Sequence, residues 1–220
     1  MLAKIFYYTL ICMQKRKLQD YIPKVKEPFR SILIFGPPGA GKGTLGKFLS
    51  SAGNHFHLSS GDIFRGLDLD SPAGKLYHSY AGKGLLLPDE VTIEIWHHFV
   101  SGLIATNRYF PSQQYLLLDG VPRTKKQAEL LDKYIQVEQI IMLDVTETNI
   151  LFKRMQRRAI LEKRSDDMEP KILKTRMEVY KKDTLKVLKH YSKGILSVFN
   201  ADQKPLEVLR DVLVELSDML

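Results

Sequence analysis

The chain has 220 residues, of which 44% are hydrophobic and 26% are charged, as is typical of a globular domain. Its length allows one large α/β domain, and its net charge of +8 suits nucleic acid, a membrane surface or phosphates as partners. The single cysteine, Cys12, excludes a disulfide framework and a four-cysteine zinc site, so we expect no zinc.

Residues 1–30 form a basic N-terminal extension punctuated by prolines. Its apolar run, residues 1–13, is too short to cross a membrane and lacks the cleavage site of a secretory signal. We therefore expect no membrane partner and a cytoplasmic protein, with organelle targeting by this extension as the weaker alternative. The role of the extension stays open, as does the true start at Met1 or Met13.

Residues 36–44 fit the pattern G-x-x-x-x-G-K-[ST], which cradles phosphates in nucleotide-binding proteins. The apolar run 31–35 before it predicts a buried strand, and residues 42–51 after it predict a helix. Glycines let the backbone curl around phosphate oxygens, and the helix start adds N–H groups and partial positive charge. We expect Lys42 to reach the β- and γ-phosphates and Thr44 to lie near Mg²⁺.

Apolar runs alternate with amphipathic segments along the rest of the chain. The expected strands are residues 31–35, 56–58, 115–120, 139–144 and 195–200. Helices are expected between them, including one from Pro170 to Gly194. Strands buried on both faces and separated by helices predict a three-layer α/β fold of the P-loop kind, with a parallel five-stranded sheet and helices on both faces.

Ligands of such a sheet bind beyond the carboxyl ends of its strands. Strand 31–35 delivers the phosphate loop there, and strand 115–120 delivers Asp119, a hard carboxylate suited to Mg²⁺ directly or through water. Asp119 could instead be a satisfied turn residue, but the phosphate loop in the same sheet favours the metal. Arginines cluster in residues 154–164 without interleaved aromatics, which favours a polyphosphate clamp and no nucleic-acid partner.

Several motifs in this order make the chain resemble the adenylate kinases, within the nucleoside monophosphate kinases. They are residues 36–44, 60–62 and 119–124 and the late arginines. The resemblance implies a kinase domain over 31–220, with a mobile AMP-binding flap at about 59–87 and a short lid at about 157–167. It also implies a monomer that uses Mg²⁺ and transfers a phosphoryl group reversibly from ATP to AMP, giving two ADP.

The resemblance assigns site residues by their match to the family's motifs. The ATP set is Gly39, Ala40, Gly41, Lys42, Gly43, Thr44, Arg158 and Lys204. The AMP set is Ser60, Arg65, Leu85, Leu86, Leu87, Gly120, Val121, Pro122, Arg123, Gln127, Arg164 and Arg176. The residues expected to act in catalysis are Lys42, Arg123, Arg154, Arg164 and Arg176, and those expected near Mg²⁺ are Thr44 and Asp119. Arg157 matches no motif and is expected to be solvated.

Two departures from the family's pattern bear on these assignments. Val121 replaces a phenylalanine, and the stretch before Arg176 is one residue longer than typical, so Lys174 competes for its role. Ser60 and Gln127 favour AMP over the runner-up function, a UMP/CMP kinase or another nucleoside monophosphate kinase. A nucleotide-binding protein without catalysis, or a nucleic-acid binder, is the remaining alternative, although every motif residue is present.

Overall fold

The computed structural model describes residues 27–162, 167 and 169–219. The strands are β1 (Phe29–Phe35), β2 (Phe56–Ser59), β3 (Leu116–Asp119), β4 (Ile135–Asp144) and β5 (Leu196–Asn200). The first helices are α2 (Lys42–Ala52), α3 (Ser60–Arg65), α4 (Pro72–Ala81), α5 (Asp89–Ala105) and α6 (Lys125–Leu131). Later come α7 (Thr148–Leu161), α8 (Pro170–Val179), the π-helical turn η2 (Tyr180–Thr184), α9 (Leu185–Val187), the 3₁₀ turns η3 (Leu188–His190) and η4 (Lys193–Ile195), and α10 (Pro205–Glu215).

The described strands form one five-stranded sheet in the order β2-β3-β1-β4-β5, and every neighbouring pair is parallel. The predicted fold class is therefore confirmed. In the β1–β3 ladder, Ile34 pairs with Asp119. The chain that follows β1 and the carboxylate that ends β3 consequently leave the sheet side by side, which brings the phosphate loop next to Asp119.

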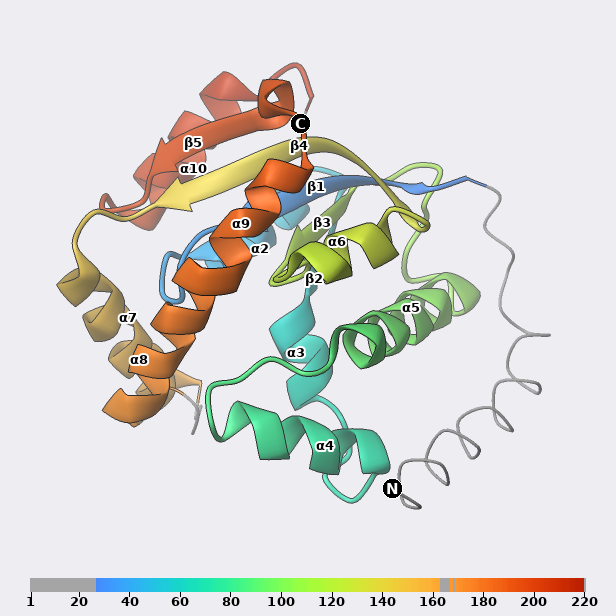
Figure 1. The fold of residues 1–220 in the computed structure, drawn as a ribbon. Coiled ribbons are helices and arrows are strands. Elements are labelled where there is room, and N and C mark those ends of the chain that lie inside the picture. The colour runs from blue at the N-terminus through green and yellow to red at the C-terminus, as the bar shows by residue number, and fades with distance from the viewer. Residues whose placement is uncertain (1–26, 163–166, 168, 220) are drawn as a thin grey trace.

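Helices cover both faces of the sheet, with α5 and α6 on one face and α2 and α10 on the other (Figure 1). Alternate strand residues point to opposite faces. Leu33 and Leu118 accordingly pack with Trp96 of α5, whereas Ile32 and Leu117 join the cluster beneath α2 and α10. The continuous apolar runs in the sequence thus reflect strands buried on both sides.

Strand β4 begins at Ile135, four residues before the start that the sequence predicts. Its pairing with β1 shifts register between Ser31 and Ile32, which leaves Glu138 as an extra residue in the ladder. The Glu138 carboxylate accepts hydrogen bonds from Arg30 Nε at 2.8 Å and from the Tyr115 hydroxyl at 2.7 Å. The charged Glu138 interrupts the apolar pattern, so the first part of β4 is not recognised as a strand from hydrophobicity. The bulge lets Glu138 reach its partners, which explains why the strand tolerates a charged residue there.

The single helix predicted over residues 170–194 is wrong in detail, because α8 passes into a π-helical turn, then α9 and a 3₁₀ turn. Hydrophobic spacing does not distinguish these helix types over so few residues. Among the described residues, we find no helix both long enough and apolar enough to cross a bilayer.

The extent of burial predicts that replacing two leucines by alanine changes the stability of the protein by different amounts. Leu117 is fully buried in the interior strand β3, whereas Leu206 of α10 is 68% exposed. We expect Leu117→Ala to lower the free energy of unfolding by about 2–5 kcal/mol, through lost burial and a cavity. Leu206→Ala should change it by less than about 0.5 kcal/mol. Urea denaturation followed by circular dichroism measures both, and equal losses would contradict the assignment of the core.

Candidate functional site

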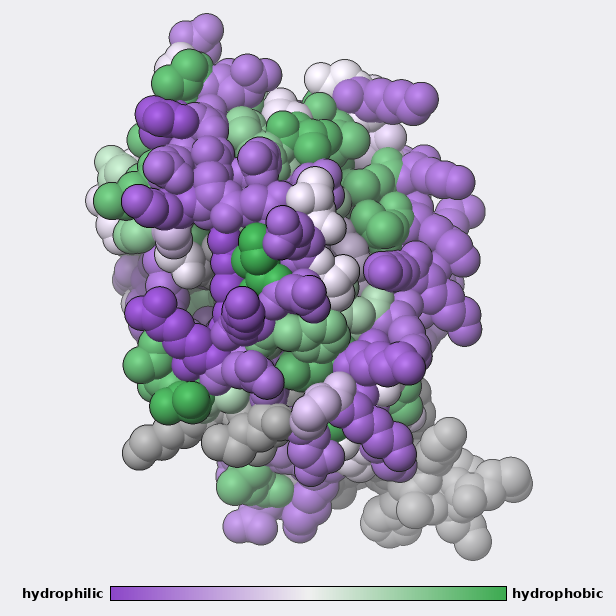
Figure 2. Space-filling model, turned by 90° about the vertical axis from the view of Figure 1, so that its left-hand side faces the viewer, coloured by the Kyte–Doolittle hydropathy of each residue, from purple (hydrophilic) through white to green (hydrophobic). Residues whose placement is uncertain are grey.

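A cavity of about 450 Å³ lies beyond the carboxyl ends of the strands. Its walls come from the phosphate loop, α3, the turn after β3, α7, α8 and the loop between β5 and α10. Hydrophilic residues predominate on the face of the molecule that carries α7 and α8, with smaller hydrophobic patches between them (Figure 2). The cavity therefore lies where a parallel sheet is expected to bind ligands.

The phosphate loop needs glycine at two positions for steric reasons. Gly36 and Gly39 have φ angles of 148° and 86°, which favour glycine. A Cβ on Gly36 would lie 2.7 Å from the carbonyl oxygen of Leu143, and one on Gly39 would lie 2.9 Å from that of Leu151. The α2 helix then begins after Gly41 without a side-chain cap and without an acidic residue in its first turn. Its first N–H groups are thus left for a ligand.

The Lys42 ammonium group folds back over the loop. It donates hydrogen bonds to the carbonyl oxygens of Gly36 at 2.8 Å and Pro37 at 3.0 Å. The pKa of Lys42 is lowered to about 8, mainly by burial and also by the charges of Arg123, Arg158 and Arg176, against the opposing effect of Asp119. A polyanion in the cavity would reverse this shift by favouring the charged amine.

The carboxylate of Asp119 lies beside the loop. It is 8% exposed, lines the cavity together with Thr44, and has one oxygen 3.5 Å from the position of a Cβ on Gly43. In the described part of the chain, no group of three or more His, Cys, Asp or Glu side chains could hold a metal by itself. One carboxylate and one hydroxyl are still a donor set that fits Mg²⁺, which usually keeps waters and takes its other ligands from phosphates.

Several arginines converge on the cavity from distant parts of the chain. The predicted ones that line it are Arg65, Arg123, Arg154, Arg158 and Arg176. Burial lowers the pKa of Arg123, and the nearby charge of Arg176 lowers it further. The site thus gathers positive charge, which a polyphosphate would neutralise.

Asp167 is a fully buried carboxylate that joins two of these arginines. Its Oδ2 accepts from Arg158 Nε at 2.7 Å, and its Oδ1 pairs with Arg176 Nη1. Arg176 therefore takes the position on the cavity wall for which Lys174 competes in the sequence, whereas Lys174 is exposed and lies outside the lining. Sequence reasoning missed the role of Asp167, for which the only signal was a pair of aspartates, Asp166 and Asp167, directly after the cluster of arginines.

Arg154, which is predicted to act in catalysis, and Lys204, which is predicted on the ATP side, each form hydrogen bonds within this chain. Arg154 donates to the carbonyl oxygens of Ala201 at 2.7 Å and of Asp202 and Gln203 at 3.2 Å each. The amide N–H of Lys204 donates to the carboxylate of Glu207 and thereby caps α10. Gln203 and Pro205, the neighbours of Lys204, line the cavity, so this segment borders it.

The predicted AMP-side residues divide into those that reach the cavity and those behind it. Gly120, Val121, Pro122 and Leu86 line it, but Leu85 is exposed and Leu87 is buried away from it. Ser60 and Gln127 are each 1% exposed and lie outside the lining.

Gln127 contacts the chain around Arg123. Its Oε1 accepts from the Arg123 N–H at 2.7 Å, and its Nε2 donates to Asp89 at 3.0 Å. In this structure Gln127 therefore holds the turn that carries Arg123. A contact with adenine stays a prediction, as does a ligand contact of Ser60.

Two arginines in the predicted lid complete this comparison. Arg164 lies outside the described residues, as do the other residues of the lid segment 163–166. Arg157 is exposed, in keeping with a solvated charge, but its side chain also borders the cavity. Sequence motifs did not assign Arg157 to the site because position on a helix, and not a motif, brings it there.

The Asp167 pairing predicts a strong effect of removing one carboxylate. Asp167→Ala leaves two partly buried guanidinium groups without their shared counter-charge, so we expect a loss of about 3 kcal/mol in the free energy of unfolding. Glu129→Ala is the control, because Glu129 pairs with Lys125 on the surface of α6 at 3.6 Å. That variant should lose less than about 1 kcal/mol in urea denaturation. Similar losses in both variants would argue against a special role for Asp167.

Comparisons with known proteins agree with this geometry. The sequence model of the family described as adenylate kinase matches residues 34–195. The chain is 33% identical to an adenylate kinase of Clostridium tetani over 215 residues, covering 83% of this chain and 96% of that protein. It is 39% identical to one of Cyanothece sp. over 168 residues, covering 73% and 80%, and 33% identical to one of Mycoplasma pneumoniae over 204 residues, covering 80% and 92%. The chain belongs to the adenylate kinase family.

Proposed function

We propose that this protein transfers a phosphoryl group reversibly from ATP to AMP, giving two ADP. The observation that carries the proposal is the meeting of the phosphate loop, Asp119 and arginines from α3, α7 and α8 at one cavity. The family match and the relatives support this acceptor over the UMP/CMP kinase alternative.

In the proposed reaction, a phosphate oxygen of AMP attacks the γ-phosphorus of ATP, and the bond from that phosphorus to the β–γ bridging oxygen breaks. Such a transition state needs in-line positioning and neutralised charge more than covalent help from the protein. Lys42 and the first N–H groups of α2 bind the donor phosphates. Arg65 and Arg123 bind the acceptor phosphate, and Arg158 and Arg176 neutralise the phosphoryl group in transfer.

Thr44 and Asp119 would hold Mg²⁺ in this scheme, directly or through water. The ion, when bound, neutralises charge on the β- and γ-phosphates. Asp119 lies beside the loop because β1 and β3 are neighbours in the sheet, and this position supports the proposed role of its carboxylate.

Two segments of the chain would close over the bound nucleotides. Residues 59–87 would form the acceptor flap and residues 157–167 the short lid, which exclude water that would otherwise hydrolyse ATP. The predicted monomer and cytoplasmic location are kept as part of this proposal. Support for the flap is that Arg65 and Leu86, from its two ends, both reach the cavity.

Incubation with ADP and Mg²⁺ tests the proposed reaction directly. We expect the protein to form ATP and AMP in equal amounts, measured by chromatography of the nucleotides. Lys42→Met removes a cation that faces the phosphates, so turnover should fall by about 100- to 1000-fold. Its melting temperature should not fall far below that of the wild type, because the variant loses two hydrogen bonds to loop carbonyls but also loses the cost of burying the charged amine.

Lys125→Met is the control for that variant, because Lys125 has a 73% exposed side chain on α6 and lies outside the cavity. It should keep wild-type turnover. Activity of Lys42→Met within a few-fold of the wild type would contradict the phosphate-binding role. A panel of AMP, CMP, UMP and GMP as acceptors decides the substrate, since faster turnover with UMP or CMP would favour the alternative kinase.

The lowered pKa of Lys42 predicts that ATP binding takes up protons. With a pKa of about 8, lowered from 10.5, Lys42 is mostly neutral at pH 8.5 in the free protein. The fully ionised triphosphate favours the charged amine, so binding should take up protons at this pH. Calorimetry in buffers of different ionisation enthalpy measures that uptake, and Lys42→Met should show none. Equal uptake in both proteins would assign the proton to another group.

The lowered pKa of Lys42 affects the stability of the free protein and its affinity for ATP in opposite directions as the pH rises. Because the folded-state pKa lies below that of the unfolded chain, the charged amine destabilises the fold at pH below about 8. This contribution diminishes as the pH rises from 8 towards 10.5, whereas ATP affinity weakens over the same range. The two trends separate an effect on binding from an effect on folding.

A further inference from the structure

A π-helical turn, η2, interrupts the helix that carries Arg176. Such turns are rare and occur mostly as single insertions within α-helices, frequently at functional sites. This one lies on the wall of the nucleotide cavity, because Arg176, Tyr180 and Thr184 all line it. The sequence motifs assigned a role to Arg176 but none to Thr184.

The π-helical turn changes the direction in which Thr184 points. In an α-helix, four residues rotate about 40° beyond one full turn around the helix axis. The side chains of residues eight apart therefore point in directions that differ by about 80°. A π-helical turn holds more residues, because its hydrogen bonds run from residue i to i+5. The step from Tyr180 to Thr184 therefore offsets the drift from Arg176 to Tyr180. Thr184 thus returns to the face of the helix that Arg176 occupies.

The Thr184 hydroxyl contacts the turn that carries Arg123. It is 8% exposed, and its Oγ1 donates to the carbonyl oxygen of Arg123 at 3.1 Å. The N–H of Arg123 is held by Gln127 at 2.7 Å, and its Nε donates to the carbonyl oxygen of Gly120 at 2.6 Å. Thr184 is therefore the contact on the carbonyl side of Arg123, across 61 residues of sequence.

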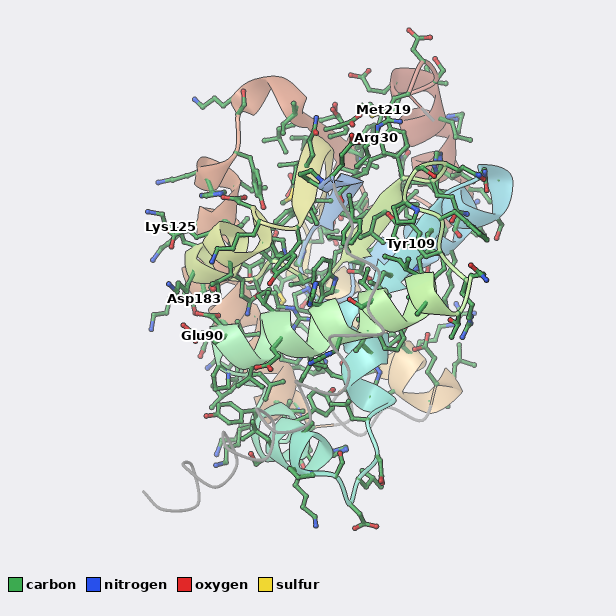
Figure 3. The ribbon with its side chains drawn as sticks, turned by 90° about the vertical axis from the view of Figure 1, so that its right-hand side faces the viewer. Arg30, Glu90, Tyr109, Lys125, Asp183 and Met219 are labelled. Carbon is green, nitrogen blue, oxygen red and sulfur yellow. The ribbon has the colours of Figure 1, made fainter. Side chains whose placement is uncertain are left out.

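The neighbours of Arg123 and Thr184 also lie close to one another on the surface of the molecule. Lys125, two residues after Arg123, and Asp183, next to Thr184, lie on the same side of the molecule (Figure 3). The positive charges of Arg123 and Arg176 repel one another, since the charge of Arg176 adds to the effect of burial in lowering the pKa of Arg123. A neutral hydroxyl–carbonyl bond holds the two elements together without adding charge to the cavity.

We propose that Thr184 is a positioning residue for phosphoryl transfer, because its bond to the Arg123 carbonyl sets where Arg123 lies relative to Arg176. This inference rests on the proposed roles of the two arginines at the phosphates. The π-helical turn contributes by bringing Thr184 onto the helix face that carries Arg176. Thr184 itself touches neither nucleotide in this scheme.

Thr184→Val tests the inference, because valine keeps the branched shape and removes the hydroxyl. A misplaced Arg123 should lower kcat by about 10- to 100-fold with little change in the KM for ATP. Thr184→Ser restores the hydroxyl and should recover kcat to within a few-fold of the wild type. Thr175→Val is the matched control in the same helix, since Thr175 donates only to Lys171 of its own helix at 3.1 Å. Its kcat should not change.

A double-mutant cycle separates positioning from a loss of stability. In the background of Arg123→Ala, Thr184→Val should lower kcat little further, because the side chain it positions is gone. An equal fold-loss in both backgrounds would overturn the inference, as would wild-type kcat in Thr184→Val. These outcomes leave the proposed function intact, whereas a wild-type protein that forms no ATP from ADP overturns both.

Discussion

Repulsion among cations gathered at one cavity is the constraint on which the rest of this structure depends. Lys42, Arg123 and Arg176 come from three separate elements and face the same space, and the charges of Arg123 and Arg176 both lower the pKa of Lys42. The fold offsets that repulsion in two ways. Neutral acceptors, mainly backbone carbonyls, hold several of the cations, and the buried carboxylate of Asp167 joins Arg158 to Arg176.

The parallel sheet makes this arrangement possible because it sends loops from neighbouring strands to one edge. The β1–β3 pairing places Asp119 beside the phosphate loop, and α2 then points its uncapped first turn at the same space. Cations held in advance of the substrate need little reorganisation when charge develops in the transition state. The energetic cost of assembling them is met by the two hydrophobic clusters on either side of the sheet.

Local chemistry explains which features could be predicted from the sequence. The loop of residues 36–44 is recognisable because close approach to phosphate demands glycines at particular positions, and the structure shows Gly36 and Gly39 where a Cβ would collide with backbone. Most of the arginines were assigned by resemblance, since an arginine has no local pattern that separates a ligand from a solvated charge. Arg157 illustrates the limit, because it is exposed and still borders the cavity.

The sequence by itself determined the five parallel strands, the phosphate loop and the carboxylate that ends β3, because each depends on neighbouring residues or on short periodic patterns. Only the tertiary structure decided the bulge at Glu138, the Asp167 pairing with two arginines and the contact of Thr184 with Arg123. These features join residues that are distant in the chain or depend on a helix register that hydrophobic spacing does not record. Their energies come from burial, opposite-charge pairing and hydrogen bonds between distant residues, which exist only once the chain has folded.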